Sequence, residues 1–293
     1  MIGCAGGCIR HAGASRILGS SMTNQSDPDR AFAGSIPQLY DTYLVPLIFQ
    51  SYAADLANRV AAREPGRVLE LAAGTGVLTR QLAAMLAPAV SIVATDLNQP
   101  MIDYAAGTGT GRPLDWRQAD AMQLPFPDKS FDVVACQFGV MFFPDKAKAF
   151  AEARRVLHDG GVFIFNVWDR IEENEFAAVV TEALASLFPG DPPRFLARTP
   201  HGYHDCAAIA QDLKEGGFSN APECTTLAAR SRADSARIPA LAYCQGTPLR
   251  GEIETRDPAR LDEATDIATA ALTKRFGAGP VDGKIQAHII TAE

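Results

Sequence analysis

Several features that would assign a chain to a particular class are absent from this sequence. No uncharged apolar run is long enough to cross a membrane, because the longest, from Gln81 to Thr95, is interrupted by Pro88. The first 21 residues contain no apolar segment of signal-peptide length. We therefore expect a cytoplasmic protein with no membrane span, in which residues 1–21 form a disordered extension and Met22 is a candidate start.

Paired cysteines and excess positive charge are also lacking. The six cysteines include no Cys-x-x-Cys pair, which argues against a zinc site or a disulfide framework and favours reduced thiols. A formal net charge of −7 at pH 7 argues against a nucleic-acid partner, because that partner requires a basic face. We expect no metal. The sequence leaves the oligomeric state open between monomer and homodimer.

The chain does show short apolar runs that alternate with helical patterns. The runs expected to be strands are residues 67–71, 90–95, 114–118, 131–137, 162–167, 224–229 and 284–292. Apolar residues at three- and four-residue spacing predict helices at 37–63, 77–86, 100–106, 146–157, 171–188, 207–215, 234–245 and 258–276. Apolar strands separated by helices predict a doubly wound, Rossmann-like α/β sheet covered on both faces. We expect one domain over residues 22–293.

The most informative stretch is Val68–Gly76, with the sequence VLELAAGTG. It predicts a buried strand that runs into a tight glycine turn, followed at once by a helix from Val77. Glycine has no Cβ, so a ligand can approach its main chain closely. The N–H groups at the start of the helix then face that ligand. A unit of this kind usually binds an adenosine-containing cofactor.

Four segments in the usual order resemble the class I S-adenosylmethionine-dependent methyltransferases, of the ubiquinone/menaquinone-biosynthesis or type 11 kind. They are Val68–Gly76, Ala94–Met101, Gln118–Phe126 with Asp128–Asp132, and Arg154–Gly161. The resemblance implies a seven-stranded sheet whose last strand is antiparallel. It also implies S-adenosylmethionine as cofactor and a small-molecule acceptor, methylated on oxygen or carbon rather than nitrogen. One departure is Ala72, where the family usually has glycine.

The resemblance also assigns residues to the cofactor. Asp96, at the end of the second strand, would accept hydrogen bonds from both ribose hydroxyls, and a charged acceptor strengthens such bonds. Asp120 would accept from the adenine amino group. Gln137 would hold the ammonium group through its carbonyl. The complete expected set is Tyr40, Glu70, Ala72, Gly74, Gly76, Asp96, Leu97, Met101, Asp120, Ala121, Gln137 and Phe138.

Each of these assignments has a purely structural alternative. Asp96 can be a helix cap, Asp120 a turn former, and Glu70 a residue that satisfies turn amides. Met101 and Phe138 can be ordinary core residues. The residue types alone leave these alternatives open.

The chain after Trp168 resembles the family only loosely, and we expect it to contribute a helical cap. Cap elements are predicted at about 37–63, 169–204 and 232–283, where they would enclose the acceptor. The candidate catalytic residues there are His201, Tyr203 and His204, because histidine and tyrosine can act as general bases or orient a hydroxyl. The alternative is a loop in which Asp205 caps the next helix.

Two other functions remain open at this point. A nicotinamide-dependent oxidoreductase would have the Gly-x-Gly-x-x-Gly fingerprint and an acidic residue about twenty positions later. Gly74, Gly76 and Asp96 fit that pattern, but Thr79 stands at the third glycine position. The other alternative is a non-catalytic protein that keeps the fold and binds S-adenosylmethionine.

Overall fold

The computed structural model describes residues 1–3, 28–30, 32 and 34–293, so nearly all of the expected N-terminal extension lies outside the described residues. The helices are η1 Pro28–Arg30, α1 Ile36–Leu39, η2 Tyr40–Phe49, α2 Gln50–Ala61, α3 Val77–Met85, α4 Gln99–Thr108, η3 Val140–Phe142, α5 Lys146–Val156, η4 Ile171–Glu173, α6 Glu175–Leu187, α7 Phe195–Arg198, α8 Cys206–Glu215, α9 Arg237–Gln245, α10 Leu249–Arg256, η5 Pro258–Arg260 and α11 Leu261–Phe276. The strands are β1 Arg67–Leu71, β2 Ser91–Asp96, β3 Asp115–Gln118, β4 Phe131–Gln137, β5 Leu157–Trp168, β6 Glu223–Ala233 and β7 Val281–Ala292.

The strands form one seven-stranded sheet in the order β3-β2-β1-β4-β5-β7-β6. The pairs from β3 to β5 are parallel, whereas β7 runs antiparallel to both β5 and β6. The central strands are buried along nearly their whole length, as expected of a parallel sheet covered on both faces. The predicted fold class, including the antiparallel last strand, is therefore confirmed.

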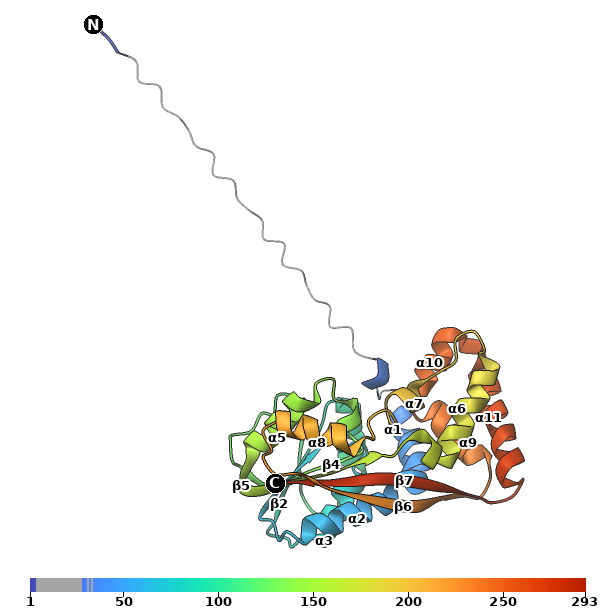
Figure 1. Ribbon diagram of the computed structural model, residues 1–293, viewed down its shortest axis with the longest axis horizontal. Helices are drawn as coiled ribbons and strands as arrows, with labels where there is room; N and C mark the ends of the chain where they lie inside the picture. Colours follow the sequence, from blue (N-terminus) through green and yellow to red (C-terminus); the bar gives the residue numbers. More distant parts are fainter. Residues whose placement is uncertain (4–27, 31, 33) are drawn as a thin grey trace.

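Helices cover both faces of this sheet. In Figure 1, α2 and α3 lie on one face, and α5 and α8 lie on the other. The apolar stripe of α2 explains its position, because Tyr52, Leu56 and Val60 are fully buried at three- and four-residue spacing. Strand order reverses beside β1, where the chain passes first outward to β2 and β3 and then back to β4. Ligands of such sheets bind at the carboxyl ends of the strands near that reversal.

Several element boundaries differ from the sequence prediction. The helix expected at 37–63 is divided into α1, η2 and α2, and η2 is a π-helix that contains Pro46, which has no N–H to donate. The strand expected at 162–167 begins earlier, because Leu157 already pairs with Phe131 ahead of a register shift. The helix α10 (Leu249–Arg256) had no clear periodic signal in the sequence.

The chain between β6 and β7 is a helical insertion that holds α9, α10 and α11. The long antiparallel pair β6–β7 reaches beyond the rest of the sheet, and these helices gather with α6 and α7 around that extended end (Figure 1). Helix α11 packs against α9 and α6, and α9 packs against η2. The insertion and the N-terminal helices thus meet over the same end of the sheet.

Candidate cofactor and acceptor site

A cavity of about 770 Å³ lies at the carboxyl ends of β1, β2 and β4. Of the residues expected to hold the cofactor, it is lined by Tyr40, Ala72, Gly74, Asp96, Leu97, Met101, Asp120, Ala121, Gln137 and Phe138. Sequence reasoning missed other lining residues, namely Arg30, Phe32, Thr95, Asn98, Ala119, Gly139, Phe142, Phe143 and Pro144. Four of these, Thr95, Asn98, Ala119 and Gly139, are immediate neighbours of predicted residues, so the motif positions could have pointed to them.

The glycine turn after β1 provides an open stretch of main chain. Gly74 has φ +56°, and a Cβ built on it would meet no atom within 4 Å. Ala72 also adopts a left-handed φ of +52°, which costs an L-residue roughly 1–2 kcal/mol. The strained position explains why glycine is usual here in the family. The open space at Gly74 is what close approach of a ligand requires.

Two expected cofactor residues, Glu70 and Gly76, do not line this cavity. Gly76 has φ +84° and precedes α3, and a Cβ on it would lie 3.1 Å from the Trp116 ring. Its glycine is therefore required by backbone conformation and packing. Glu70 is 1% exposed, and burial raises its pKa to about 8. Its Oε2 atom has no hydrogen-bond partner in the part of the chain that the structure describes.

Asp96 ties the two turns of the cavity together. Its Oδ2 accepts a hydrogen bond from the Gly74 N–H at 2.9 Å, and its Oδ1 accepts one from the Asn98 N–H at 2.8 Å. Burial raises the pKa of Asp96, while these amide hydrogen bonds lower it. The Asn98 side chain also donates from Nδ2 to Oδ1, at 3.4 Å. A carboxylate offers about four lone-pair sites, so one, on Oδ2, remains for a ligand. Asp96 can therefore accept hydrogen bonds from the backbone, as a capping residue does, and still contact a ligand.

Two further polar groups face the same cavity. Asp120 accepts a hydrogen bond from the Met122 N–H through Oδ1 at 2.9 Å, so it does form a turn, and within the described part of the chain no bond is found to its other oxygen. Gln137 donates from Nε2 to the Phe49 carbonyl at 2.9 Å. Its buried Oε1 has no partner among the described residues. Buried polar atoms are normally paired, so an unpaired acceptor on a cavity wall fits a bound ligand with donor groups.

A second cavity, of about 560 Å³, adjoins the first. Phe32, Tyr40, Phe138 and Phe142 line both. The remaining wall is mainly apolar and consists of Leu44, Ile48, Phe49, Trp168, Asn174, Phe195, Leu196, Pro200, His201, Tyr243 and Thr247. The Phe138 ring stacks on Trp168, with 3.8 Å between the ring centroids. Phe138 therefore belongs to the aromatic core and to both cavities at once.

Of the candidate catalytic residues, only His201 reaches the second cavity. Its Nδ1 donates a hydrogen bond to the Asp169 carbonyl at 2.8 Å, which fixes the tautomer and leaves Nε2 as an acceptor. Burial lowers its pKa to about 4, so the ring is neutral near pH 7. Its side chain is 6% exposed, and no bond to Nε2 is found among the described residues. The second cavity therefore contains a fixed hydrogen-bond acceptor.

Tyr203 and His204 line neither cavity. The Tyr203 hydroxyl donates to Asp212 at 2.6 Å, and Lys146 lies over its ring. His204 contacts the His201 carbonyl through Nδ1 at 3.0 Å. Asp205 caps α8 by accepting the Ala207 N–H. At these positions the structure follows the alternative of a helix-capping loop.

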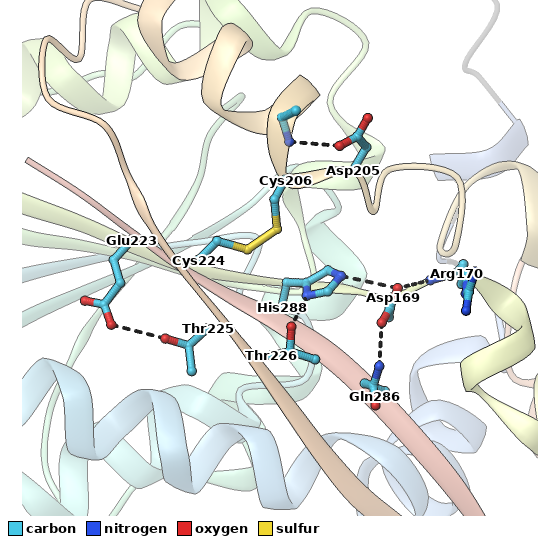
Figure 2. The surroundings of a disulfide bond; sticks show 11 residues. Asp169, Arg170, Asp205, Cys206, Glu223, Cys224, Thr225, Thr226, Gln286 and His288 are labelled. Atoms are coloured by element: carbon cyan, nitrogen blue, oxygen red, sulfur yellow. Dashed lines mark hydrogen bonds and ion pairs between the residues drawn. A yellow bond between two sulfur atoms is a disulfide. The ribbon is translucent and has the colours of Figure 1, made fainter.

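The expectation that all cysteines are reduced is wrong for one pair. A disulfide joins Cys206, the first residue of α8, to Cys224 in β6 (Figure 2). These residues are 18 positions apart, and only the pairing of α8 with β6 in space reveals their proximity. Cys136 and Cys244 are free and buried, whereas Cys4 and Cys8 lie outside the described residues.

This pair belongs to the one cluster in the described part of the chain that could hold a metal. Ligand atoms of Cys206, Cys224 and His288 lie within 4.8 Å of one another. Both sulfurs are bonded to each other, and both ring nitrogens of His288 have partners. The predicted absence of a metal stays a prediction.

The sheet order, the cavity at the strand ends and the acidic residue closing β2 define a domain built to bind an adenosine-containing cofactor. Comparison with known proteins identifies which kind. Residues 69–165 match the type 11 methyltransferase domain family. The demethylmenaquinone methyltransferase of Thermus thermophilus is 41% identical over 186 residues, which cover 58% of this chain and 84% of that relative.

A second relative and a solved structure agree. The ubiquinone/menaquinone biosynthesis C-methyltransferase UbiE of Stutzerimonas stutzeri is 31% identical over 170 residues, covering 54% of this chain and 66% of the relative. A Haemonchus contortus phosphoethanolamine N-methyltransferase 2, in complex with phosphomonomethylethanolamine and S-adenosylhomocysteine, has a similar fold. Its TM-score is 0.55 at 16% identity, over 90% of this chain and 59% of that one.

The chain belongs to the class I S-adenosylmethionine-dependent methyltransferases, of the type 11 kind that includes UbiE. Its cofactor is S-adenosylmethionine, and the nicotinamide alternative is disfavoured. No helix in the described part of the chain is long and apolar enough to span a membrane.

Proposed function

We propose that the protein transfers the methyl group of S-adenosylmethionine to a carbon or oxygen atom of a small, mainly apolar ring held in the second cavity. The observation that carries this proposal is the shared wall of Phe32, Tyr40, Phe138 and Phe142. A cofactor in the first cavity and an acceptor in the second would meet at these rings. Pockets lined mainly by apolar and aromatic side chains with a few polar groups are typical of small-molecule sites.

S-adenosylmethionine supplies a methyl group that its sulfonium already activates. The protein therefore has to align the acceptor atom with the donor and exclude water. We assign Gly74, Asp96 and Asp120 to cofactor binding, because their free space or free lone pairs face the first cavity. The face of Phe138 favours a nearby positive charge. These groups account for binding and orientation without any general base.

The second cavity favours a flat acceptor. Its wall is dominated by aromatic rings, including the stacked pair Phe138–Trp168 and the pair Tyr40–Phe49, whose centroids lie 5.0 Å apart. The side chains of Asn174 and Thr247 already donate hydrogen bonds to backbone carbonyls. The Nε2 atom of His201 remains to contact a polar group of the acceptor, beside the hydroxyls of Tyr40 and Tyr243 in the same wall.

His201 would accept a hydrogen bond from an acceptor hydroxyl. That hydrogen bond draws electron density toward the acceptor oxygen, and toward ring carbons conjugated with it, and so makes either atom a better nucleophile. A neutral histidine can take this role because its other nitrogen is held by the Asp169 carbonyl. The names of the relatives, which include a C-methyltransferase, support carbon over oxygen. A cytoplasmic location stays a prediction, and the oligomeric state stays open between monomer and homodimer.

The direct test uses tritium-labelled S-adenosylmethionine and a panel of acceptors. The panel contains a naphthohydroquinone, a monocyclic hydroquinone, a catechol and a primary amine, all kept in oxygen-free buffer. We expect label in one of the hydroxylated rings and none in the amine. Mass spectrometry and NMR of the product then distinguish a carbon-bound from an oxygen-bound methyl group.

Two variants make the result specific to the proposed site. His201→Gln keeps a polar side chain of similar length but removes the ring acceptor, and it should lower transfer to the accepted ring. His204→Gln is the matched control, since His204 lines neither cavity. Transfer only to the amine, or equal transfer by the wild type and His201→Gln, would reject the proposal.

A further inference from the structure

The disulfide Cys206–Cys224 lies next to the segment that carries His201. Cys206 begins α8, five positions after His201, and Cys224 lies near the start of β6. Their Cα atoms are 6.6 Å apart, within the usual range for a disulfide. The bond therefore anchors segment 199–205 to the sheet from its C-terminal side.

A chain of hydrogen bonds anchors the same segment from the other side. Thr226, two residues after Cys224, faces His288 across the β6–β7 pair, and its hydroxyl lies 2.9 Å from His288 Nδ1. His288 Nε2 lies 3.2 Å from Asp169 Oδ1 (Figure 2). The Asp169 carbonyl accepts the hydrogen bond from His201 Nδ1.

These contacts close a ring. It runs from His201 along the loop to Cys206, across the disulfide to β6, and back through Thr226, His288 and Asp169. Asp169 is fixed further by the side chain of Gln286, which donates to Oδ2 at 2.6 Å. Among the described residues, the disulfide is the one covalent side-chain link between the loop and β6. The imidazole that faces the second cavity is therefore held by a bond that redox chemistry can open.

The sulfurs are placed for exchange with small thiols. Cys224 is exposed and Cys206 half-buried, so a thiolate can reach the Cys224 sulfur. Cys206 would leave as a thiolate at the start of α8. The free cysteines Cys136 and Cys244 are fully buried, and burial raises the pKa of both. They are poor competitors for the same reaction.

We propose that Cys206 and Cys224 are a reversible oxidation site whose disulfide positions His201 at the wall of the second cavity. This inference rests on the acceptor role proposed for His201. In the reductive direction, an external dithiol attacks the disulfide through a mixed disulfide, Cys206 and Cys224 become thiols, and the dithiol closes to its own disulfide. In the oxidative direction, the two thiols give two electrons and two protons to oxidised glutathione, which becomes two glutathione thiols.

The first experiment needs no acceptor. Hydrogen–deuterium exchange is measured on the full chain after treatment with oxidised glutathione and after dithiothreitol, with a chelator present so that reduced sulfurs hold no metal. We expect residues 199–205 to exchange roughly 10-fold faster after reduction and to recover on reoxidation. The Cys206→Ser/Cys224→Ser double variant should exchange like the reduced protein under both treatments. Equal exchange in the two wild-type forms would overturn the proposal.

The second experiment separates this inference from the proposed function. The double serine variant and wild type are compared, without added thiol, on the ring acceptor found in the panel, or on the naphthohydroquinone as probe. We expect kcat/KM for the acceptor to fall roughly 3- to 10-fold in the double variant, because His201 is less well placed, with the KM for S-adenosylmethionine unchanged. If His201→Gln is impaired but the double variant is not, the redox inference fails alone. If His201→Gln is unimpaired, the proposed function fails.

Discussion

The two cavities are built from structural elements that differ in kind. The first is formed mainly by turns that follow β1, β2 and β4, and its polar groups are held by main-chain contacts such as those of Asp96 with Gly74 and Asn98. The second is formed by aromatic rings from η2, β5 and the cap, and His201 supplies its free acceptor atom. Enzymes that share a cofactor need the same backbone geometry around it, whereas their acceptors differ in shape. In this chain, main-chain contacts accordingly position the polar groups of the first cavity, and packed side chains shape the second.

The largest expected effect is the pH dependence of folding stability that His201, in the second cavity, produces. His201 has a pKa of about 4 in the folded chain, against an ordinary value of 6.5. Unfolded chains take up this proton near pH 6.5 and folded ones only near pH 4, so stability is lost as pH falls through that window. The loss attributable to His201 should reach about 3 kcal/mol. Urea unfolding at several pH values measures it.

Variants assign that loss to one residue. His201→Gln should remove this part of the pH dependence between pH 6.5 and 4, whereas His204→Gln should retain it. If stability depends on pH in the same way in both variants, His201 is not buried and neutral in the folded protein. The second cavity would then lack the hydrogen-bond acceptor that distinguishes it from the first.

The disulfide should contribute to stability near the second cavity. It closes a loop between positions 18 apart, for which chain-entropy arguments give about 3 kcal/mol. Urea unfolding with and without dithiothreitol measures the difference. The Cys206→Ser/Cys224→Ser variant should match the reduced protein and show no response to dithiothreitol. Equal stability in both redox states would show that the loop gains nothing from the bond.

Asp96→Ala tests the first cavity. We expect a loss of about 2 kcal/mol in affinity for S-adenosylhomocysteine, or roughly a 30-fold higher Kd, because a charged acceptor facing the ligand is removed. Isothermal titration measures this, and circular dichroism checks folding, since the Gly74 and Asn98 amides also lose their partner. Asp96→Asn keeps the shape and one acceptor oxygen, and should fall between. Unchanged affinity in a folded Asp96→Ala protein would remove Asp96 from the cofactor site.

The smallest expected effect is a gain in folding stability. Ala72 lies at φ +52°, so Ala72→Gly should relieve left-handed strain and stabilise the fold by about 1 kcal/mol, less the added freedom of the unfolded chain. Thermal unfolding measures the change. Ala54→Gly, in the interior of helix α2, is the opposite control and should destabilise. A Tm that drops for both variants would show that the turn carries no strain at Ala72.

The first cavity was largely predictable because its motifs are local. The strands at 67–71 and 131–137 match prediction, and most expected residues line the first cavity. Glu70 and Gly76 are exceptions, since a motif gives a residue's position but not the direction of its side chain. The second cavity was not predictable in detail. Its rings come from distant segments, and the free Nε2 of His201 depends on a contact with Asp169, 32 positions away. The disulfide was not predicted for the same reason, because its two cysteines are brought together only by the fold.

The first cavity is assigned to the cofactor and the second to the acceptor. Two measurements on the His201→Gln variant test this assignment together. Isothermal titration of S-adenosylhomocysteine is combined with transfer of tritium-labelled methyl to the accepted ring at saturating cofactor. We predict a cofactor Kd within about twofold of wild type and a kcat/KM for the acceptor lower by roughly 10- to 100-fold. A variant that loses cofactor affinity, or that methylates as well as wild type, would contradict it.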